Sequence, residues 1–438
     1  MKSINKYSCS TIVNGREKVA KDSKAFRRIR NCIFISGLSV FAQLYLFQPM
    51  LSELCTSFHI TPVMSSLAVS VSTVGMAVGL FIFAFKADCI SREKLMGFTL
   101  VVSSLLTIAS AFVWSFPMLL IINFLKGMVL SGVSAVALAY LSEEVSASVI
   151  GLAISLYLSG NTIGGMMGRV TGTLISGWSD WRYAAFVIGV ISLLLGIIFV
   201  RKIPSSTNFS PSRVHIKDKL SQMSSFLGKF MFLGMYMIAA LVMGAFVSIY
   251  NYLSFILESP QFGLPHYIVA MIFMMYTVGV AGSIVTGKLS DKYDPVILLR
   301  GAIILMLVGL LLLLIMQLWT IILGLGVITF AFFSTHTMAS RIVAGNAQYA
   351  KSSATCLYWL FYYVGSSIMG SLTGIVLSTY GWNPFVWVIV LFVAFAFIIS
   401  VVSTEKIAEK KPHFNRIGKL RMVSIINLIH HHPNSKFK

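Results

Sequence analysis

The sequence has little charge and few acids. Lys, Arg, Asp and Glu make up 11% of the 438 residues, and only 14 are acidic, whereas soluble domains carry about 25% charged residues. The five cysteines include no CxxC pair, so neither a disulfide framework nor a zinc site is expected. The sequence also has no GxxxxGK[ST] loop for a nucleotide and no convergent catalytic set, which argues against an ATP-driven pump and against an enzyme. No cofactor is expected.

Long hydrophobic segments take the place of charge. Hydrophobic residues make up 57% of the chain and the mean hydropathy is +0.85. About 20 apolar residues cross a bilayer, and lone strands cannot remain in lipid. We therefore expect an all-α membrane protein with twelve transmembrane helices, near 31–52, 66–87, 95–114, 117–140, 149–173, 183–200, 230–254, 266–287, 296–316, 319–341, 353–378 and 384–403.

A polar stretch divides these segments into two sets of six. The expected regions are a basic N-terminal tail (1–30), a first six-helix bundle (31–200), a linker (201–229), a second bundle (230–403) and a basic C-terminal tail (404–438).

The positive charge is concentrated on one side of this topology. Of the 34 Lys and Arg residues, 31 fall in the tails, the linker and the loops on the side of the termini. Such residues stay in the cytoplasm, so both termini are expected there, in a multi-pass protein of the inner (plasma) membrane. The net charge of +20 is thus a topology signal, and no nucleic acid partner is expected.

The two halves repeat one another. Tyr45 and Glu53 in the first segment precede Tyr250 and Glu258 in the seventh by the same interval of 205 residues. Repeats of this kind are typical of secondary transporters, whose two bundles enclose a site near the midplane. We expect two pseudo-symmetric bundles that work by alternating access.

Two loops resemble a family motif. They read Ala84-Phe-Lys-Ala-Asp88-Cys-Ile-Ser-Arg92-Glu-Lys94 and Gly287-Lys-Leu-Ser-Asp291-Lys292. Both are similar to the G-x-L-x-D-R-x-G-R-R loop of the major facilitator superfamily. The resemblance implies that Asp88, Arg92, Lys94, Asp291 and Lys292 hold a cytoplasmic gate through ion pairs.

The fifth segment carries a second family pattern. Gly160, Gly164 and Gly168 follow the spacing of the family's antiporter motif, and Arg169 stands in place of its last glycine. A role in gating an antiporter and ordinary close packing of helices are both open. Stretches such as Tyr45-x-x-Gln48-Pro49 and Ser159-Gly-Asn161-x-Ile-Gly-Gly-x-x-Gly-Arg169 resemble the acriflavine-sensitivity (YnfM-like) branch of efflux proteins, which implies export.

Few polar residues lie inside the segments, so each is a candidate for a substrate site. Lys126 is expected near the midplane, one turn from Asn123, where it attracts an anionic or zwitterionic substrate. Alternatively, its stem covers apolar surface while its ammonium group reaches water. The other expected substrate-binding residues are Tyr45, Gln48, Asn161, Tyr250 and Asn251.

Three residues are candidates for proton coupling. Glu53 and Glu258 occupy equivalent outer ends of the first and seventh segments, where two carboxylates share a proton if they meet. His336 has a side chain whose ordinary pKa suits a relay, although a lone histidine is more often a packing residue. For Glu53 and Glu258, the alternative is two solvated loop acids.

These observations favour proton-coupled export of a small organic molecule by a monomer in the lipid bilayer. Proton-symport uptake of an anionic nutrient or metal chelate is an alternative, because a buried lysine does not fix the direction. A non-transporting membrane sensor is a further alternative, but the sequence has no large soluble segment that could form a sensing domain.

Overall fold

The computed structural model describes residues 18–20, 23–86, 89–146, 149–209, 216–347 and 350–409. The first bundle contains α1 (Lys24–Leu44), η1 (Gln48–Met50), α2 (Leu51–Phe58), α3 (Pro62–Lys86), α4 (Arg92–Ser110), α5 (Phe116–Glu144), α6 (Ile150–Trp178) and α7 (Trp181–Lys202). The second contains α9 (Phe230–Leu257), α10 (His266–Ile272), η3 (Phe273–Met275), α11 (Tyr276–Leu289), α12 (Pro295–Leu312), α13 (Leu318–Asn346), α14 (Lys351–Tyr380) and α15 (Trp382–Glu409). The helix α8 (Ile216–Leu227) lies in the linker.

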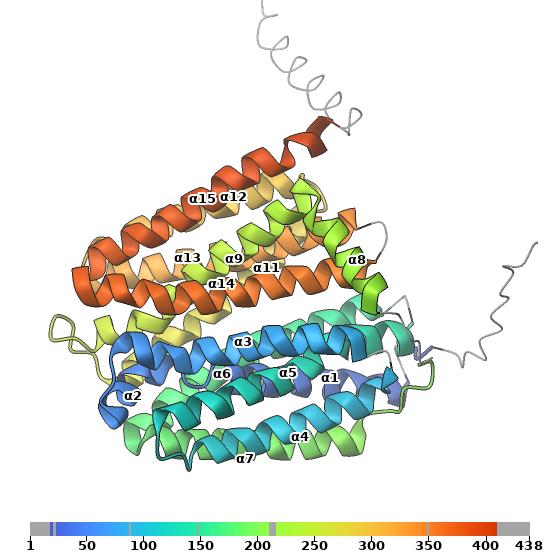
Figure 1. The fold of residues 1–438 in the computed structure, drawn as a ribbon, viewed down its shortest axis with the longest axis horizontal. Coiled ribbons are helices and arrows are strands. Elements are labelled where there is room, and N and C mark those ends of the chain that lie inside the picture. The colour runs from blue at the N-terminus through green and yellow to red at the C-terminus, as the bar shows by residue number, and fades with distance from the viewer. Residues whose placement is uncertain are drawn as a thin grey trace, which may run out of the picture.

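The long helices of each bundle run side by side, and the two bundles lie next to each other (Figure 1). Eleven helical segments of the described residues are long and apolar enough to cross a membrane, with α1–η1–α2 and α10–η3–α11 each forming one segment. The helix α6 has 29 residues, as many as α5, but it is rich in Gly, Ser and Thr and carries Arg169. With α6, the described segments give the expected twelve.

Local sequence signals place the helix ends. Asp294 caps α12 because its carboxylate accepts a hydrogen bond from the Val296 amide at 2.7 Å, and Pro295 follows at the first helical position. Proline is favoured there because its missing N–H has no partner within the helix in any case. Ser23 caps α1 in the same way, by accepting from the Phe26 amide at 3.0 Å.

Matching helix pairs pack closely in both bundles. A Cβ atom added to Gly160 on α6 would lie 2.4 Å from the carbonyl oxygen of Phe34 on α1. A Cβ atom added to Gly365 on α14 would lie 2.2 Å from the carbonyl oxygen of Ala240 on α9. Glycine is required for backbones to approach this closely. The two contacts occupy equivalent places in the halves, as the repeat in the sequence predicts.

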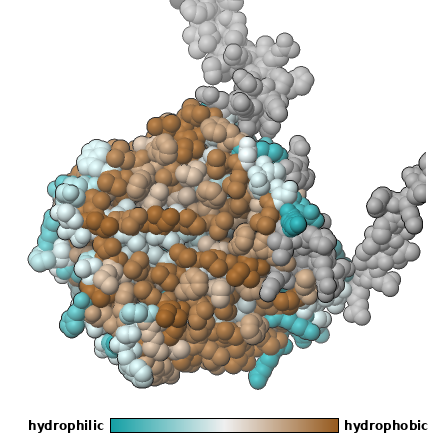
Figure 2. Space-filling view, viewed as in Figure 1, coloured by the Kyte–Doolittle hydropathy of each residue, from teal (hydrophilic) through white to brown (hydrophobic). Residues whose placement is uncertain are grey.

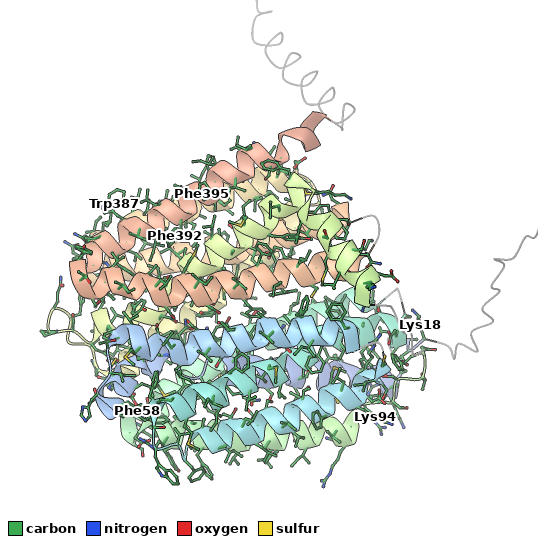
Figure 3. All side chains as sticks on the ribbon, viewed as in Figure 1. Lys18, Phe58, Lys94, Trp387, Phe392 and Phe395 are labelled. Carbon is green, nitrogen blue, oxygen red and sulfur yellow. The ribbon has the colours of Figure 1, made fainter. Side chains whose placement is uncertain are left out.

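The surface carries a broad hydrophobic belt with polar residues at both ends (Figure 2). On its outer face α15 exposes Trp387 by 51% and Phe395 by 52% (Figure 3). Trp114 and Trp178 near the helix ends are 88% and 89% exposed, a position that suits the interface between lipid and water. This is the surface of a protein embedded in a membrane.

Hydrogen bonds between the bundles gather toward one end of the molecule. The end where α1 begins and α15 ends, at the right of Figure 1, is called here the termini end. In the opposite half, the hydroxyl oxygens of Ser70 and Ser371 lie 2.6 Å apart, and so do those of Thr73 and Ser367. These contacts close the opposite end.

The linker helix α8 connects the bundles at the termini end (Figure 1). Lys219 donates a hydrogen bond to the carbonyl oxygen of Ala84 in the first bundle. Gln222 accepts one from the Ser353 hydroxyl in the second bundle, at 3.1 Å. The linker therefore contacts both halves through one short helix.

Candidate functional site

The first span is interrupted in its middle. An unbroken helix would need Pro49 to donate to the carbonyl of Tyr45, which proline cannot do. Instead α1 ends at Leu44, and the Gln48 amide donates to the Tyr45 carbonyl at 3.1 Å to begin the 3-10 turn η1. The eighth span is also interrupted by a 3-10 turn, η3, which contains no proline. Interrupted helices near the midplane are where transporters build their binding sites, and α6 packs against both interruptions.

Arg169 on α6 lies between the two interruptions. Its side chain is buried, with 2% of the residue exposed. Its Nε donates to Oε1 of Gln48 at 2.7 Å, and its Nη1 donates to the carbonyl of Gly165 at 2.6 Å. A charge is thus held inside the membrane region by neutral acceptors.

Two tyrosines contact this guanidinium, one from each bundle. The Arg169 Cζ atom lies 4.3 Å from the ring centroid of Tyr45 and 4.3 Å from that of Tyr276. Contacts between a cation and an aromatic face become stronger where water is excluded. They are among the contacts that stabilise the unpaired charge.

Gln48 continues the hydrogen bonds into the second bundle. Its Nε2 donates to Oδ1 of Asn251 at 2.7 Å, and Nδ2 of Asn251 donates to the carbonyl of Gly370 at 3.0 Å. Tyr45, Gln48, Arg169, Asn251 and Tyr276 are called here the Arg169 cluster. The sequence singled out the first four, but Tyr276 was missed because its place depends on how the two bundles meet.

Tyr250 lies beside the Arg169 cluster. Its ring centroid is 5.0 Å from that of Tyr276, and its hydroxyl lies 2.7 Å from Oγ1 of Thr329. Phe246, one turn earlier, stacks on Phe332 with centroids 3.9 Å apart. Aromatic side chains therefore extend from the cluster into the second bundle.

Lys126 approaches the interrupted first span from another helix, α5. It is fully buried, its Nζ lies 4.8 Å from the ring centroid of Phe47, and this Nζ has no hydrogen-bond partner among the described residues. The ammonium group therefore does not reach the surface of the protein in this structure. Asn123, one turn away, donates to the carbonyl of Ala68 at 3.1 Å, while its Oδ1 is unpartnered.

Neither buried cation has an acidic partner among the described residues. Their ion pairs include Arg92–Glu143, Arg182–Asp180 and Arg341–Asp291, and Glu258 lies beside His266. Lys126 and Arg169 thus remain positive charges without a counter-charge, on either side of the consecutive residues Phe47 and Gln48.

The glycines and Asn161 of α6 face α1. Cβ atoms added to Gly164 and Gly168 would lie 2.2 and 2.4 Å from the carbonyl oxygens of Leu38 and Ala42, as with Gly160. Asn161 lies against Gly37 of α1, and its Oδ1 has no partner. These residues therefore support the packing of α6 on α1, up to Gly168 beside Arg169.

Glu258 connects the bundles at the opposite end. Its Oε2 accepts a hydrogen bond from the Ser52 hydroxyl on α2 at 2.9 Å, and its Oε1 lies 2.9 Å from Nδ1 of His266. Burial raises the pKa of the Glu258 carboxyl, although His266 and Ser52 oppose this effect. Glu53 follows Ser52 on α2 and is half-buried. The sequence did not indicate His266, whose contact with Glu258 depends on the loop between α9 and α10.

His336 lies within an aromatic cluster of the second bundle. Its Nδ1 is 2.8 Å from the Tyr358 hydroxyl, and the rings of Trp359 and Tyr362 lie 5.2 and 5.0 Å from its own. A cavity of about 10 Å³ adjoins it, which is room for roughly one water molecule. This environment is that of a hydrogen-bonded packing residue.

The gating residues at the termini end pair within their own bundles. Arg92 lies 3.0 Å from Glu143, and Arg341 lies 3.3 Å from Asp291. Asp88 lies outside the described residues. Lys94 and Lys292 are exposed, and Lys94 extends away from the bundle (Figure 3).

The chain is similar to membrane transporters over most of its length. The family described as Major Facilitator Superfamily matches residues 33–370. An uncharacterized MFS-type transporter, YybF of Bacillus subtilis, is 33% identical over 395 residues, which cover 90% of this chain and 98% of that protein. The inner membrane transport protein YnfM of Escherichia coli is 33% identical over 401 residues, covering 87% and 92%.

The fold is also that of a solved transporter. A bacterial homologue of the human lysosomal transporter Spinster, in an inward-facing and occupied conformation, aligns with a TM-score of 0.72 at 14% identity. The alignment covers 88% of this chain and 98% of that one.

Proposed function

The chain belongs to the major facilitator superfamily, and we propose that it exports a small organic molecule with an acidic group from the cell in exchange for protons. It is a multi-pass membrane transporter and not an enzyme. In the proposed cycle it acts as a monomer, with both termini in the cytoplasm. The two bundles then expose a shared site to either side in turn.

The observation that carries the proposal is the pair of buried cations at the interrupted first span. Charges inside a membrane protein are costly and mark substrate or ion pathways. Because Lys126 and Arg169 have no acidic partner among the described residues, a bound anion supplies the missing counter-charge. The substrate is accordingly anionic or zwitterionic.

The two ends of the bundles bear on the direction of transport and on the residues that exchange protons. The hydrogen bonds between the bundles in the opposite half support a state that exchanges substrate at the termini end, which is the cytoplasm in the proposed topology. Glu258 is the candidate to exchange protons with the outside, because its carboxyl contacts both Ser52 in the first bundle and His266 in the second.

Everted membrane vesicles test this function. Radiolabelled organic anions and cations are offered under an imposed proton gradient, with inside-acid vesicles compared with vesicles treated with an uncoupler. Uptake of anions that collapses with the uncoupler is expected. Uptake of the same anions only by right-side-out vesicles would instead favour proton symport, and no transport of any compound by purified, reconstituted protein would contradict the proposal.

A further inference from the structure

The guanidinium of Arg169 lies over two aromatic rings and is hydrogen-bonded through its nitrogens. Its Cζ atom is 4.3 Å from the ring centroids of Tyr45 and Tyr276, and a planar guanidinium donates its hydrogen bonds in its own plane. In that plane Nε donates to the neutral amide oxygen of Gln48. A carboxylate in the same position would form a stronger, charge-assisted bond.

We propose that the edge of Arg169 binds the carboxylate of an aromatic acid, and that this carboxylate replaces Gln48 and so loosens the contact between the bundles. The inference rests on the proposed function, because it names the substrate class of the same central site. It assigns Arg169 a role in substrate binding.

The charge and the shape of the surroundings indicate this class of ligand. The planar guanidinium matches a carboxylate in two parallel hydrogen bonds, which a neutral amide cannot reproduce. Aromatic side chains continue from Tyr276 to Tyr250 and Phe246, with ring centroids 5.0 and 5.6 Å from that of Tyr276. A ring attached to the carboxylate would pack against them in an edge or offset geometry.

Replacement of Gln48 has a consequence for the second bundle. While Arg169 holds Oε1 of Gln48, the Nε2 of the same amide points at Asn251 and donates to it at 2.7 Å. Once the carboxylate takes the arginine, nothing fixes the orientation of the Gln48 amide. The link to Asn251 weakens, and opening of the opposite end becomes easier.

A built-in carboxylate tests this step without knowledge of the natural substrate. Gln48→Glu keeps an acceptor for Arg169 but removes the donor to Asn251. The reporter is the pair Ser70→Cys and Ser371→Cys, whose native hydroxyl oxygens lie 2.6 Å apart, in a chain with its five native cysteines replaced by alanine. The rate of disulfide formation in lipid nanodiscs then reports closure of the opposite end.

We expect Gln48→Glu to slow the cross-linking about fivefold, as loss of one buried hydrogen bond predicts. Sodium benzoate should slow the reporter in the otherwise unchanged chain, whereas benzamide, the neutral analogue, should not. In Gln48→Glu benzoate should have no further effect. Ser367→Ala is the matched control, because it removes another bond between the bundles, to Thr73, and should leave the benzoate response intact.

Thermal unfolding measures benzoate binding independently of the cross-linking reporter. Benzoate should raise the thermal unfolding midpoint of the unchanged chain and of Gln48→Leu, which leaves the arginine edge free. It should not raise that of Gln48→Glu or Arg169→Gln. Equal responses to benzoate and benzamide, or cross-linking of Gln48→Glu at the unchanged rate, would overturn the inference.

These outcomes separate the inference from the proposed function. If benzoate acts on the reporter but the vesicles show no proton-coupled transport, the carboxylate site at Arg169 is still supported and the proposed proton coupling is contradicted. If protons drive anion export and Arg169→Gln does not change it, the proposed function is still supported and the carboxylate site at Arg169 is contradicted.

Discussion

At the scale of single residues, the most unusual side chain is Lys126. Its ammonium is buried without a hydrogen-bond partner in the part of the chain that the structure describes, a costly arrangement that a packing role alone does not require. We expect Lys126→Met to keep or raise thermal stability and to lower anion transport more than about tenfold, the loss expected when a buried charge loses its partner. Stability and transport are measured on the same reconstituted sample.

Lys126→Arg is the matched control, since it keeps the positive charge. It should retain part of the transport. Full transport by Lys126→Met would remove this residue from the mechanism.

The buried carboxyl of Glu258 should make the folding stability depend on pH. Burial raises the pKa of its carboxyl in the folded protein, so the folded state holds this proton to a higher pH than the unfolded chain does. The contribution of this carboxyl to the free energy of unfolding is therefore present in acid and is lost as the pH rises through the raised pKa. Glu258→Gln, which imitates the protonated form, should match the unchanged chain in acid and exceed its unfolding midpoint above that pKa.

The measurement is the difference in unfolding midpoint between the two proteins across pH 4 to 8. A difference that is constant with pH would show that Glu258 does not titrate in this way. If the double variant Glu53→Gln, Glu258→Gln left the pH dependence of transport unchanged, both carboxylates would be excluded from proton coupling.

The sequence could identify single polar residues but not most of their partners. Gln48 and Asn251 were both expected to line the site, and the structure joins them directly. Tyr276 and His266 lie in stretches without a distinctive pattern. Tyr276 reaches Arg169 only because the two bundles meet, and His266 reaches Glu258 through the loop between α9 and α10. Tertiary contacts of this kind leave no local signal.

At the scale of helices, the glycines of α6 set how closely it packs on α1. We expect Gly164→Ala to destabilise the protein by about 1–3 kcal/mol, the usual range for overpacking, because its Cβ would lie 2.2 Å from a backbone oxygen of Leu38. Gly287→Ala is the control, since a Cβ there meets nothing within 4 Å. Thermal unfolding followed by tryptophan fluorescence compares the two variants.

Equal stability of the two variants would contradict the packing role of Gly164. A loss of transport by Gly164→Ala at unchanged stability would instead support the antiporter interpretation of the motif.

Hydropathy identified the spans but not their interruptions. Hydropathy predicts one continuous segment over 31–52, whereas α1 ends at Leu44 and the span continues through η1 and α2 to Phe58. Pro49 was the available signal, because its missing N–H breaks the helical bonding. The linker helix α8 was not expected, since the linker is polar and its helix is held by contacts with both bundles.

At the scale of the whole molecule, transport requires the opposite end to open. We expect a disulfide between Thr73→Cys and Ser367→Cys to stop transport, because the native hydroxyl oxygens are 2.6 Å apart across the bundles. Addition of a reductant should restore it. Transport is measured in reconstituted vesicles before and after reduction, with each single cysteine variant as a control.

Unchanged transport by the fully oxidised protein would show that the bundles do not separate at this contact. The repeat in the sequence made the two-bundle design predictable, but the side on which the bundles are closed depends on side-chain contacts that have no counterpart in sequence spacing.

Lys126 and Arg169, which have no acidic partner within the described ranges, both belong to the first bundle, so the empty carrier retains these charges when it changes its orientation. A bound anion cancels one of these charges, which makes the loaded and empty forms respond differently to membrane voltage. One elementary charge moved through 100 mV corresponds to about 2.3 kcal/mol. Voltage-clamped bilayers should therefore show that an interior-negative potential acts more strongly on the return of the empty carrier than on the movement of the loaded one.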